Sequence, residues 1–324
     1  MQTSCRAELN IAGCRCIVEG AEPHELRWLA RHWAFTRQLV KPLPYPILLK
    51  FKEEEPRDPS AFGGQAISTS LPGTNLVWAD LGGRSWQTGD ARTGVRLRIG
   101  ARAIEITVWR TPSAECTPLV SAALYVALAE ALRTNGLLLL HAAVAVHRGR
   151  ATAFVGHSGV GKTTTLISLI ARGWTPVAED VACYDVASGM ISGSDRGVHL
   201  APVALGRQSI ARELWCPHSS GKLFLSYADL GTRRMPAAPL QQLVFLRRDA
   251  SQPTQWREVT RYEAVRGWYE GAGIPMCARN RQAFAARIPK LLDSVATAGL
   301  TVGNTPLSFW EDTVNPGIER ACDS

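Results

Sequence analysis

Residues 156–163 read Gly156-His157-Ser158-Gly159-Val160-Gly161-Lys162-Thr163 and match the pattern G-x-x-x-x-G-K-[ST] at each fixed position. The apolar stretch Ala153-Phe154-Val155 precedes this octapeptide. A helical pattern follows it to Arg172, with Gly173 placed to end the helix. A strand, a glycine-rich turn and a helix in this order let backbone amides surround phosphate groups. The stretch predicts a phosphate-binding loop; the alternative is a glycine-rich turn in an ordinary βα unit.

Each fixed position of this loop has a physical role. The glycines allow the backbone to point its amide hydrogens inward, where side chains would obstruct a phosphate. Lys162 is expected to reach the β- and γ-phosphates of ATP, and the Thr163 hydroxyl is expected to ligate Mg²⁺. The expected nucleotide-binding residues are Gly156, His157, Ser158, Gly159, Val160, Gly161, Lys162, Thr163 and Thr164.

Two adjacent acids, Glu179 and Asp180, follow the next predicted strand, residues 174–178. One carboxylate there can hold the metal or its water shell, while its neighbour accepts a proton from a substrate hydroxyl. The expected metal ligands are therefore Thr163, Glu179 and Asp180. The alternative is that the two acids form an exposed acidic turn.

The rest of the pattern predicts an α/β chain of two domains, residues 1–115 and 116–324. The first is expected to be a smaller α+β domain whose role is open between binding a substrate, binding a partner and contacting only the other domain, and the second is expected to carry the loop. Its predicted elements are a strand at 9–18, a helix from Pro23, a loop at 53–73 and a small antiparallel sheet from 75–78, 95–99 and 103–109. The second domain has helices at 117–134, 161–172 and 280–298, and strands at 137–147, 151–155, 174–178, 198–205, 222–226, 240–246 and 300–302.

Composition limits the partners. The 324 residues carry a formal net charge of +8, which favours an acidic partner such as a nucleotide or an acidic peptide. The basic residues are scattered, so no nucleic-acid partner is expected. The eight cysteines form no C-x-x-C pair, and Cys14 and Cys16 are expected to pack on one side of a strand. Reduced thiols and the lack of a bilayer-length apolar run predict a cytoplasmic protein without a membrane partner.

Three segments together resemble the catalytic core of HPr kinase/phosphorylase and of HPr-kinase-like proteins. They are His141-Ala142-Ala143-Val144-Ala145-Val146, the loop at 156–163, and Val177-Ala178-Glu179-Asp180-Val181. The match covers about residues 137–185 well and continues weakly to about residue 246. The resemblance implies a P-loop fold related to phosphoenolpyruvate carboxykinase. It departs from the regulatory kinases, which carry two aspartates where this chain has Glu179 and Asp180.

By this resemblance, Lys162 binds phosphate and Thr163 binds the metal. One of Glu179 and Asp180 acts as the base while the other assists the metal, and His141 lies near the transferred phosphoryl group. Weaker candidates for phosphate contacts are Arg196, His199 and Lys222.

Phosphorylation of HPr itself is unsupported, because the glycine-rich signature that faces HPr has only a poor counterpart at residues 197–200. Related proteins phosphorylate a serine of a ribosomally made peptide precursor, such as a lasso peptide precursor, and another branch phosphorylates free serine. The expected acceptor is therefore a peptide or small protein, with a small molecule as the alternative. Because members of the parent family form hexamers, the resemblance also implies that this chain can form a homo-oligomer.

Two other functions keep the nucleotide but not the acceptor. One is an ATPase or GTPase that couples hydrolysis to a partner, although the N/T-K-x-D element of guanine specificity is absent from the sequence. The other is a nucleotide sensor without catalysis.

Overall fold

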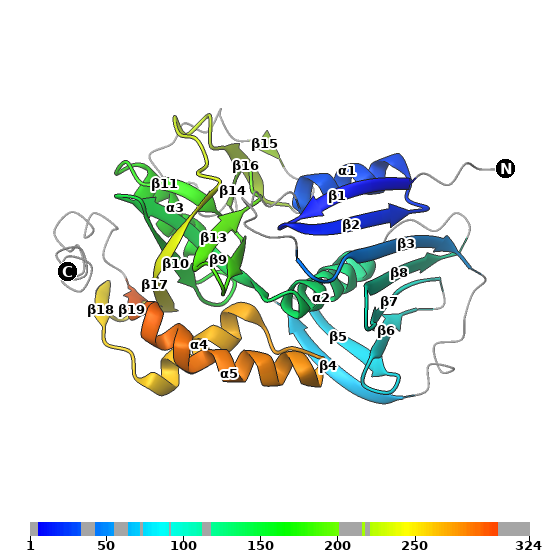
Figure 1. Cartoon of the computed structure of the whole chain (residues 1–324). Helices are drawn as coiled ribbons and strands as arrows, with labels where there is room; N and C mark the ends of the chain where they lie inside the picture. Colours follow the sequence, from blue (N-terminus) through cyan, green and yellow to red (C-terminus); the bar gives the residue numbers. More distant parts are fainter. Residues whose placement is uncertain are drawn as a thin grey trace. The chain divides into compact units, whose positions relative to one another are not determined.

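The computed structural model describes residues 6–33, 43–54, 64–71, 74–90, 92–111, 118–200, 216–217 and 221–303. The chain forms two compact units (Figure 1). Unit 1 contains Met1–Leu139, Cys183–Ser188 and Ala272–Arg287, and unit 2 contains Leu140–Ala182, Gly189–Gly271 and Ile288–Ser324.

Unit 1 is built on an eight-stranded sheet in the order β1-β2-β3-β8-β7-β6-β5-β4. The pairings β2–β3 and β3–β8 are parallel, and the others are antiparallel. Helix α1 (Pro23–His32) connects β2 to β3, and α2 (Pro118–Thr134) packs against β6, β7 and β8. The strands are β1 (Arg6–Ile11), β2 (Cys14–Glu19), β3 (Ile47–Glu53), β4 (Gln65–Leu71), β5 (Thr74–Asp80), β6 (Ser85–Gly89), β7 (Thr93–Ile99) and β8 (Ile104–Arg110).

The sequence pattern misses one turn and the strands β3, β4 and β6 of this sheet. The single strand predicted at 9–18 is wrong, because the chain turns sharply at Ala12 and Gly13, which have φ values of 51° and 85°. Asn10 Oδ1 accepts the Gly13 N–H at 2.7 Å and fixes this turn. The loop predicted at 53–73 contains β4, and β6 was not predicted. Cys14 and Cys16 are both buried on one side of β2, as their spacing predicts.

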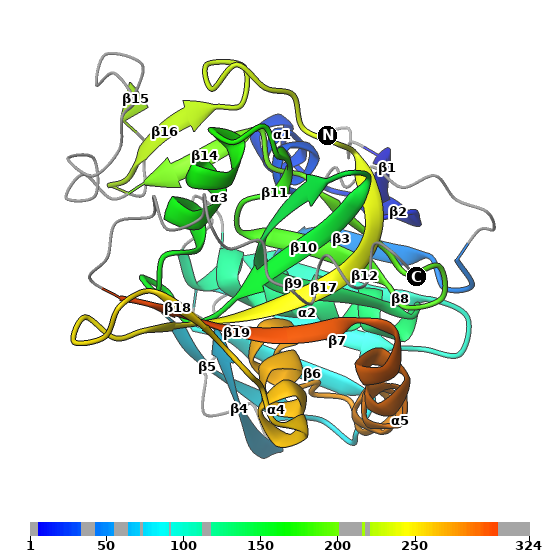
Figure 2. The same cartoon turned by 90° about the vertical axis from the view of Figure 1, so that its left-hand side faces the viewer.

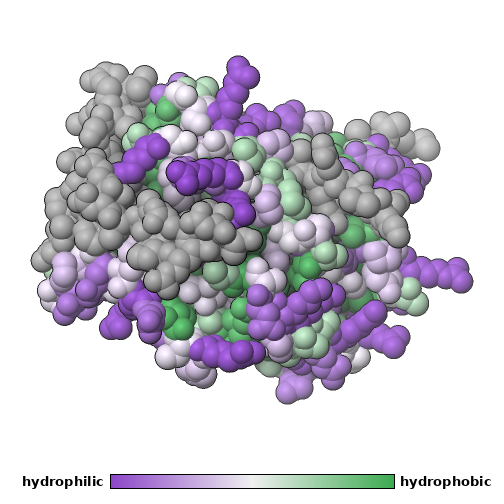
Figure 3. All heavy atoms as spheres, turned by 60° about the vertical axis from the view of Figure 1, so that its left-hand side comes forward, coloured by the Kyte–Doolittle hydropathy of each residue, from purple (hydrophilic) through white to green (hydrophobic). Residues whose placement is uncertain are grey.

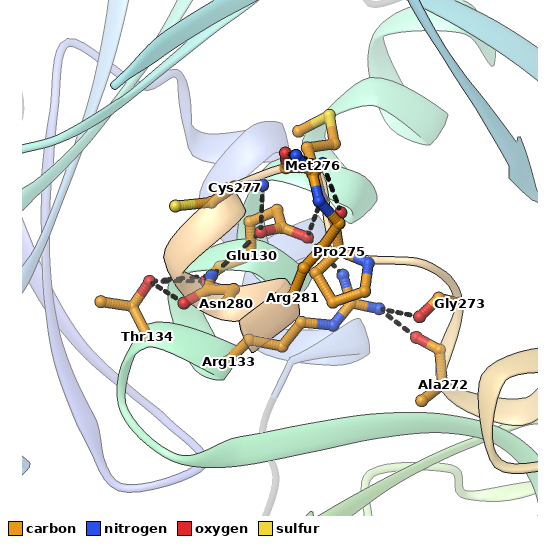
Figure 4. Close-up of polar contacts among 10 residues, drawn as sticks. All are labelled: Glu130, Arg133, Thr134, Ala272, Gly273, Pro275, Met276, Cys277, Asn280 and Arg281. Atoms are coloured by element: carbon orange, nitrogen blue, oxygen red, sulfur yellow. Dashed lines mark hydrogen bonds and ion pairs between the residues drawn. The ribbon is translucent and has the colours of Figure 1, made fainter. Parts of the chain in front are cut away.

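A buried polar cluster in unit 1 joins α2 to the connection between α4 (Arg261–Ala272) and α5 (Ala278–Ser294) (Figure 4). Glu130 is fully buried and accepts the backbone N–H groups of Met276 at 2.9 Å and Cys277 at 3.4 Å, just before α5 begins. Arg133 pairs with Glu130 at 2.5 Å and donates to the carbonyl of Ala272, the last residue of α4. The pair thus satisfies backbone groups at the end of one helix and the start of the next.

Unit 2 is built on a mixed sheet in the order β10-β9-β12-β13-β17-β19-β18, with β11 paired to β9. Strand β10 runs parallel to β17, and β17 runs parallel to β19, so their carboxyl ends meet at one edge. The strands are β9 (Leu137–His147), β10 (Arg150–Val155), β11 (Thr175–Ala178), β12 (Val181–Asp185), β13 (Met190–Gly193), β17 (Ala237–Arg248), β18 (Gln255–Arg257) and β19 (Ala296–Val302).

Helices lie on both faces of this sheet (Figure 2). Helix α3 (Lys162–Ile170) shares a hydrophobic core with Phe154 and Val244 and with a second, three-stranded sheet. That small sheet has the order β14 (Gly197–Leu200), β16 (Leu223–Ser226), β15 (Cys216–Pro217). Helix α4 covers the opposite face, where a Cβ on Gly267 would lie 1.9 Å from the Phe245 ring. Alternation along β17 sends Val244 to one layer and Phe245 to the other.

The chain is therefore a mixed α/β protein with large mixed sheets. The predicted strand-turn-strand at 137–155 and the helix after the glycine loop are confirmed. The predicted strand at 198–205 lies partly outside the described residues. Its described part belongs to β14, and the predicted strand at 222–226 corresponds to β16, both in the separate three-stranded sheet. Helix α4 was not predicted. The expected boundary at residues 115 and 116 also falls outside the described residues, and α2 belongs to unit 1.

None of the helices in the described ranges is both long and apolar enough to cross a bilayer. On the face drawn in Figure 3, hydrophilic side chains alternate with small hydrophobic areas. Among the described residues, the most exposed large apolar side chains are Tyr262 and Ile274, at 76% and 70%.

Candidate functional site

The glycine loop, Gly156–Gly161, joins the carboxyl end of β10 to α3. Its three glycines have positive φ values of 156°, 80° and 113° at Gly156, Gly159 and Gly161. A Cβ on Gly156 would also lie 2.9 Å from the Leu246 carbonyl oxygen of β17. The positions that the sequence pattern fixes as glycine are thus positions where a side chain is strained or obstructed.

The amino end of α3 faces the loop and has no side-chain cap. Its N-cap is Gly161, which has no side chain to accept the first amide hydrogens of the helix. These amides and the helix dipole carry partial positive charge, so the end of α3 is suited to an anion.

Lys162 is buried at the first position of α3, with 7% of its surface exposed. Its Nζ donates to the carbonyl oxygens of Gly156 at 2.7 Å and His157 at 3.2 Å. Burial lowers the pKa of Lys162, while the charges of Asp180 and Glu179 act in the opposite direction. The ammonium group therefore lies inside the loop, next to the two acids.

Arg248 is a cation at this edge that the motif did not indicate. It ends β17, and its Nη1 donates to the Gly159 carbonyl oxygen at 3.4 Å. Because β10 and β17 are parallel neighbours, a basic residue at the end of the predicted strand 240–246 was the available signal.

Glu179 follows β11 and is almost fully buried, with 4% exposed. Its Oε1 accepts the Thr163 hydroxyl at 2.5 Å, and its Oε2 lies 3.2 Å from His199 Nδ1. Both carboxylate oxygens thus have partners on other elements, α3 and β14. The alternative of an exposed acidic turn does not fit Glu179.

Asp180 differs from its neighbour in exposure and partner. Its side chain is 55% exposed, and its Oδ1 lies 3.2 Å from Nδ1 of His141 on β9. The Asp180 carbonyl also accepts the Ala142 N–H at 3.0 Å. The two acidic side chains therefore point in different directions. Glu179 lies toward α3 and β14, and Asp180 lies toward β9.

His141 lies on β9, and its Nδ1 is the ring nitrogen that contacts Asp180. Its Nε2 is buried without a hydrogen-bond partner in the part of the chain that the structure describes. Burial lowers the pKa of His141, the charge of Asp180 raises it and that of Lys162 lowers it again. Burial therefore favours the neutral imidazole at this position.

Asp195 lies behind the acidic pair and was not predicted as a site residue. Its Oδ2 accepts two successive backbone N–H groups, from Glu179 at 2.7 Å and Asp180 at 3.2 Å. Burial and then the charge of Glu179 raise the pKa of Asp195 to about 6, against the lowering effect of these two hydrogen bonds. The available signal was an acid just before the predicted strand at 198–205.

The other predicted residues occupy different positions around the loop. His157 and Ser158 are exposed at its tip, Val160 is buried in the core below it, and Thr164 is partly buried on α3. Among the weaker candidates, His199 is partly buried and contacts Glu179. The charge of Lys222 lowers the pKa of Lys162, and that of Arg196 lowers the pKa of Arg234.

Within the described ranges, His, Cys, Asp and Glu side chains form no group of three or more that could hold a metal. Mg²⁺ usually keeps several waters and is bound by one or two carboxylates together with substrate phosphates. The Thr163 hydroxyl and the Glu179 carboxylate, 2.5 Å apart beside an anion-suited helix end, fit that incomplete type of site.

The arrangement brings together a glycine loop, a lysine inside it, a hydroxyl beside a carboxylate, and a second carboxylate beside a histidine. Comparison with protein-family models finds no family that matches the chain, and comparison with curated proteins finds no match either.

Proposed function

We propose that the protein is an ATP- and Mg²⁺-dependent phosphotransferase of the HPr-kinase-like type, with a P-loop core. It transfers the γ-phosphoryl group to a hydroxyl, most simply a serine of a peptide or small protein. The observation that carries this proposal is the hydrogen bond between Thr163 and Glu179, because it joins the glycine loop to the acidic pair. A glycine-rich turn without a ligand would not need this connection.

Binding of the triphosphate is supported by the loop and its cations. The uncapped amides of α3 and the loop glycines supply donors for phosphate oxygens. Lys162 exchanges its two carbonyl contacts for the β- and γ-phosphates, and Arg248 is placed beside Gly159 to add a second positive charge.

The metal role belongs to Thr163 and Glu179. Their contact places a hydroxyl oxygen 2.5 Å from one carboxylate oxygen, while His199 Nδ1 lies 3.2 Å from the other. Mg²⁺ held by this hydroxyl and carboxylate would neutralise negative charge on the phosphates. Glu179 is buried, so its charge is poorly screened at that point.

The proton-accepting role belongs to Asp180. It is the more exposed acid, within reach of an incoming acceptor, and it contacts His141. Asp180 takes the proton of the acceptor hydroxyl as that oxygen bonds to the γ-phosphorus, the bond from phosphorus to the bridging oxygen breaks, and ADP leaves. His141 orients the carboxylate through its Nδ1.

The test is incubation with γ-labelled ATP and Mg²⁺, with acidic and neutral serine peptides, free serine or no acceptor, followed by mass spectrometry. Labelled peptide supports the proposal, and labelled serine alone would place the acceptor among small molecules. If phosphate is released at the same rate with every acceptor and without one, the protein would be an ATPase instead.

Three variants test the assigned roles in the same assay. Lys162→Ala is expected to abolish transfer and weaken ATP binding, whereas Asp180→Asn should spare binding and lower turnover. Transfer that persists in both Asp180→Asn and Glu179→Gln would contradict the mechanism.

A further inference from the structure

The end of β13 and the segment that follows it lie next to the acidic pair. A Cβ on Gly193 would lie 2.0 Å from the Val177 carbonyl oxygen and 2.8 Å from Ala178 Cβ, so only glycine allows this approach. Arg234 donates to the Gly193 carbonyl, and the neighbouring Met235 N–H donates to the Pro176 carbonyl at 2.8 Å. The chain around residue 193 is thus held against the end of β11.

Asp195 is the point where this segment reaches the acidic pair. One oxygen, Oδ2, accepts the N–H groups of both Glu179 and Asp180. Two successive amides directed at one atom fix the backbone on both sides of the peptide bond that joins these residues. Their side chains then diverge, Glu179 to Thr163 and Asp180 to His141.

We propose that Asp195 is a positioning residue that separates the two acids into a metal-side and a proton-accepting carboxylate. This role rests on the proposed phosphotransfer. Asp195 would act through Glu179 and Asp180, without touching the nucleotide or the acceptor. Its hydrogen bonds require an acceptor oxygen at this place, not a negative charge.

The geometry argues against a purely structural role. A third carboxylate beside Glu179 and Asp180 adds like-charge repulsion, which raises the pKa of Asp195 in addition to the effect of burial. The hydroxyl of Tyr227, whose pKa is raised first by burial and then by the charges of Asp195 and Glu179, is buried without a partner among the described residues. The two amides that Asp195 holds belong to Glu179 and Asp180 themselves, so its oxygen fixes the peptide bond from which the two site carboxylates diverge.

The first experiment compares Asp195→Ala, Asp195→Asn and the matched control Asp229→Ala. Asp229 also accepts a backbone N–H, from Ser226 at 3.3 Å, but it holds the turn after β16. Labelled-ATP turnover and its Mg²⁺ dependence are measured together with Mg²⁺-free binding of a fluorescent ATP analogue. Asparagine keeps an acceptor oxygen for both amides, and alanine does not.

Asp195→Ala is expected to bind the Mg²⁺-free analogue within about twofold of wild type and to lose turnover by about 10- to 100-fold, with a higher Mg²⁺ requirement. Asp195→Asn should recover most of that loss, and Asp229→Ala should match wild type. Equal turnover in Asp195→Ala and wild type, or equal loss in the alanine and asparagine variants, would overturn the proposal.

A second measurement separates this proposal from the proposed function. Amide hydrogen exchange of nucleotide-free protein should show Glu179 and Asp180 losing protection in Asp195→Ala but not in Asp195→Asn. Wild type that neither binds nor turns over ATP would contradict the phosphotransfer. Unchanged protection of both amides in Asp195→Ala would contradict the positioning role alone.

Discussion

The Thr163 hydroxyl donates to Glu179 Oε1 at 2.5 Å, across a separation of 16 residues in the chain. Thr163 is the second residue of α3, and Glu179 directly follows β11. This contact links the loop and the acidic pair in a single site.

Thr163→Val removes the hydroxyl while keeping a side chain of similar shape. Glu179 then lacks one donor and the metal one ligand, so we expect the Mg²⁺ affinity of the ATP complex to fall by about 10- to 100-fold. Thr163→Ser keeps the hydroxyl and should stay near wild type. Mg²⁺ titrations of ATP turnover test this, and equal titration curves for the valine and serine variants would refute it.

Gly159 and Gly149 provide a matched pair. Both have positive φ, 80° and 78°, and a Cβ on either would meet nothing within 4 Å. Alanine at either position should lower the free energy of unfolding by about 1–2 kcal/mol, because both acquire the same left-handed strain. Only Gly159→Ala should also weaken ATP binding, measured by calorimetry, because Gly149 lies in the β9–β10 turn. Equal ATP affinity in the two variants would argue against a phosphate loop.

The Glu130–Arg133 pair should matter for stability. Glu130→Ala leaves Arg133 buried without its carboxylate and removes the acceptor for two amides at the start of α5. We expect a loss of about 3–5 kcal/mol in the free energy of unfolding. The exposed pair Arg266–Glu270 is the control, since Glu270→Ala should cost under about 1 kcal/mol. Urea denaturation followed by tryptophan fluorescence measures both, and equal losses would show that burial of the first pair is unimportant.

The raised pKa of Asp195 also predicts that the stability of the folded protein depends on pH. Its pKa is raised from 3.8 to about 6, so between these values the folded state holds more protons than the unfolded state. The stability that Asp195 contributes to the folded state is therefore present below about pH 4 and is lost as the pH rises through about 6. The charged groups around it are Glu179, Asp180 and Arg234.

Asp195→Asn removes this titration. Without Mg²⁺, its melting temperature should exceed that of wild type at pH 7, and the difference should shrink toward pH 4. Thermal unfolding at a series of pH values tests the prediction, and a pH-independent difference would contradict it.

Local patterns predicted the part of the fold that surrounds the loop. The G-x-x-x-x-G-K-[ST] match, the apolar strand before it and Gly173 after the helix located β10 and α3 to within about two residues. Both elements depend on local backbone requirements, and the residues next to them in the sequence indicate these requirements.

Long-range pairing could not be predicted in the same way. The parallel pairings of β3 with β2 and β8, and the pairing of β14 with β16, join segments that are not adjacent in sequence. The same limit applies to the site. Lys162, Thr163, Glu179 and Asp180 belong to motifs, but Asp195 and Arg248 reach them only through the fold.

The central claim is that residues 156–163 hold the phosphates of a nucleotide. Isothermal titration of MgATP into wild type, Lys162→Ala and Gly149→Ala tests it most directly. We predict saturable binding to wild type and to Gly149→Ala, with affinity about 10- to 100-fold weaker in Lys162→Ala because a charged hydrogen-bond donor is lost. Wild type that does not bind MgATP, or binding that Lys162→Ala leaves unchanged, would contradict the account.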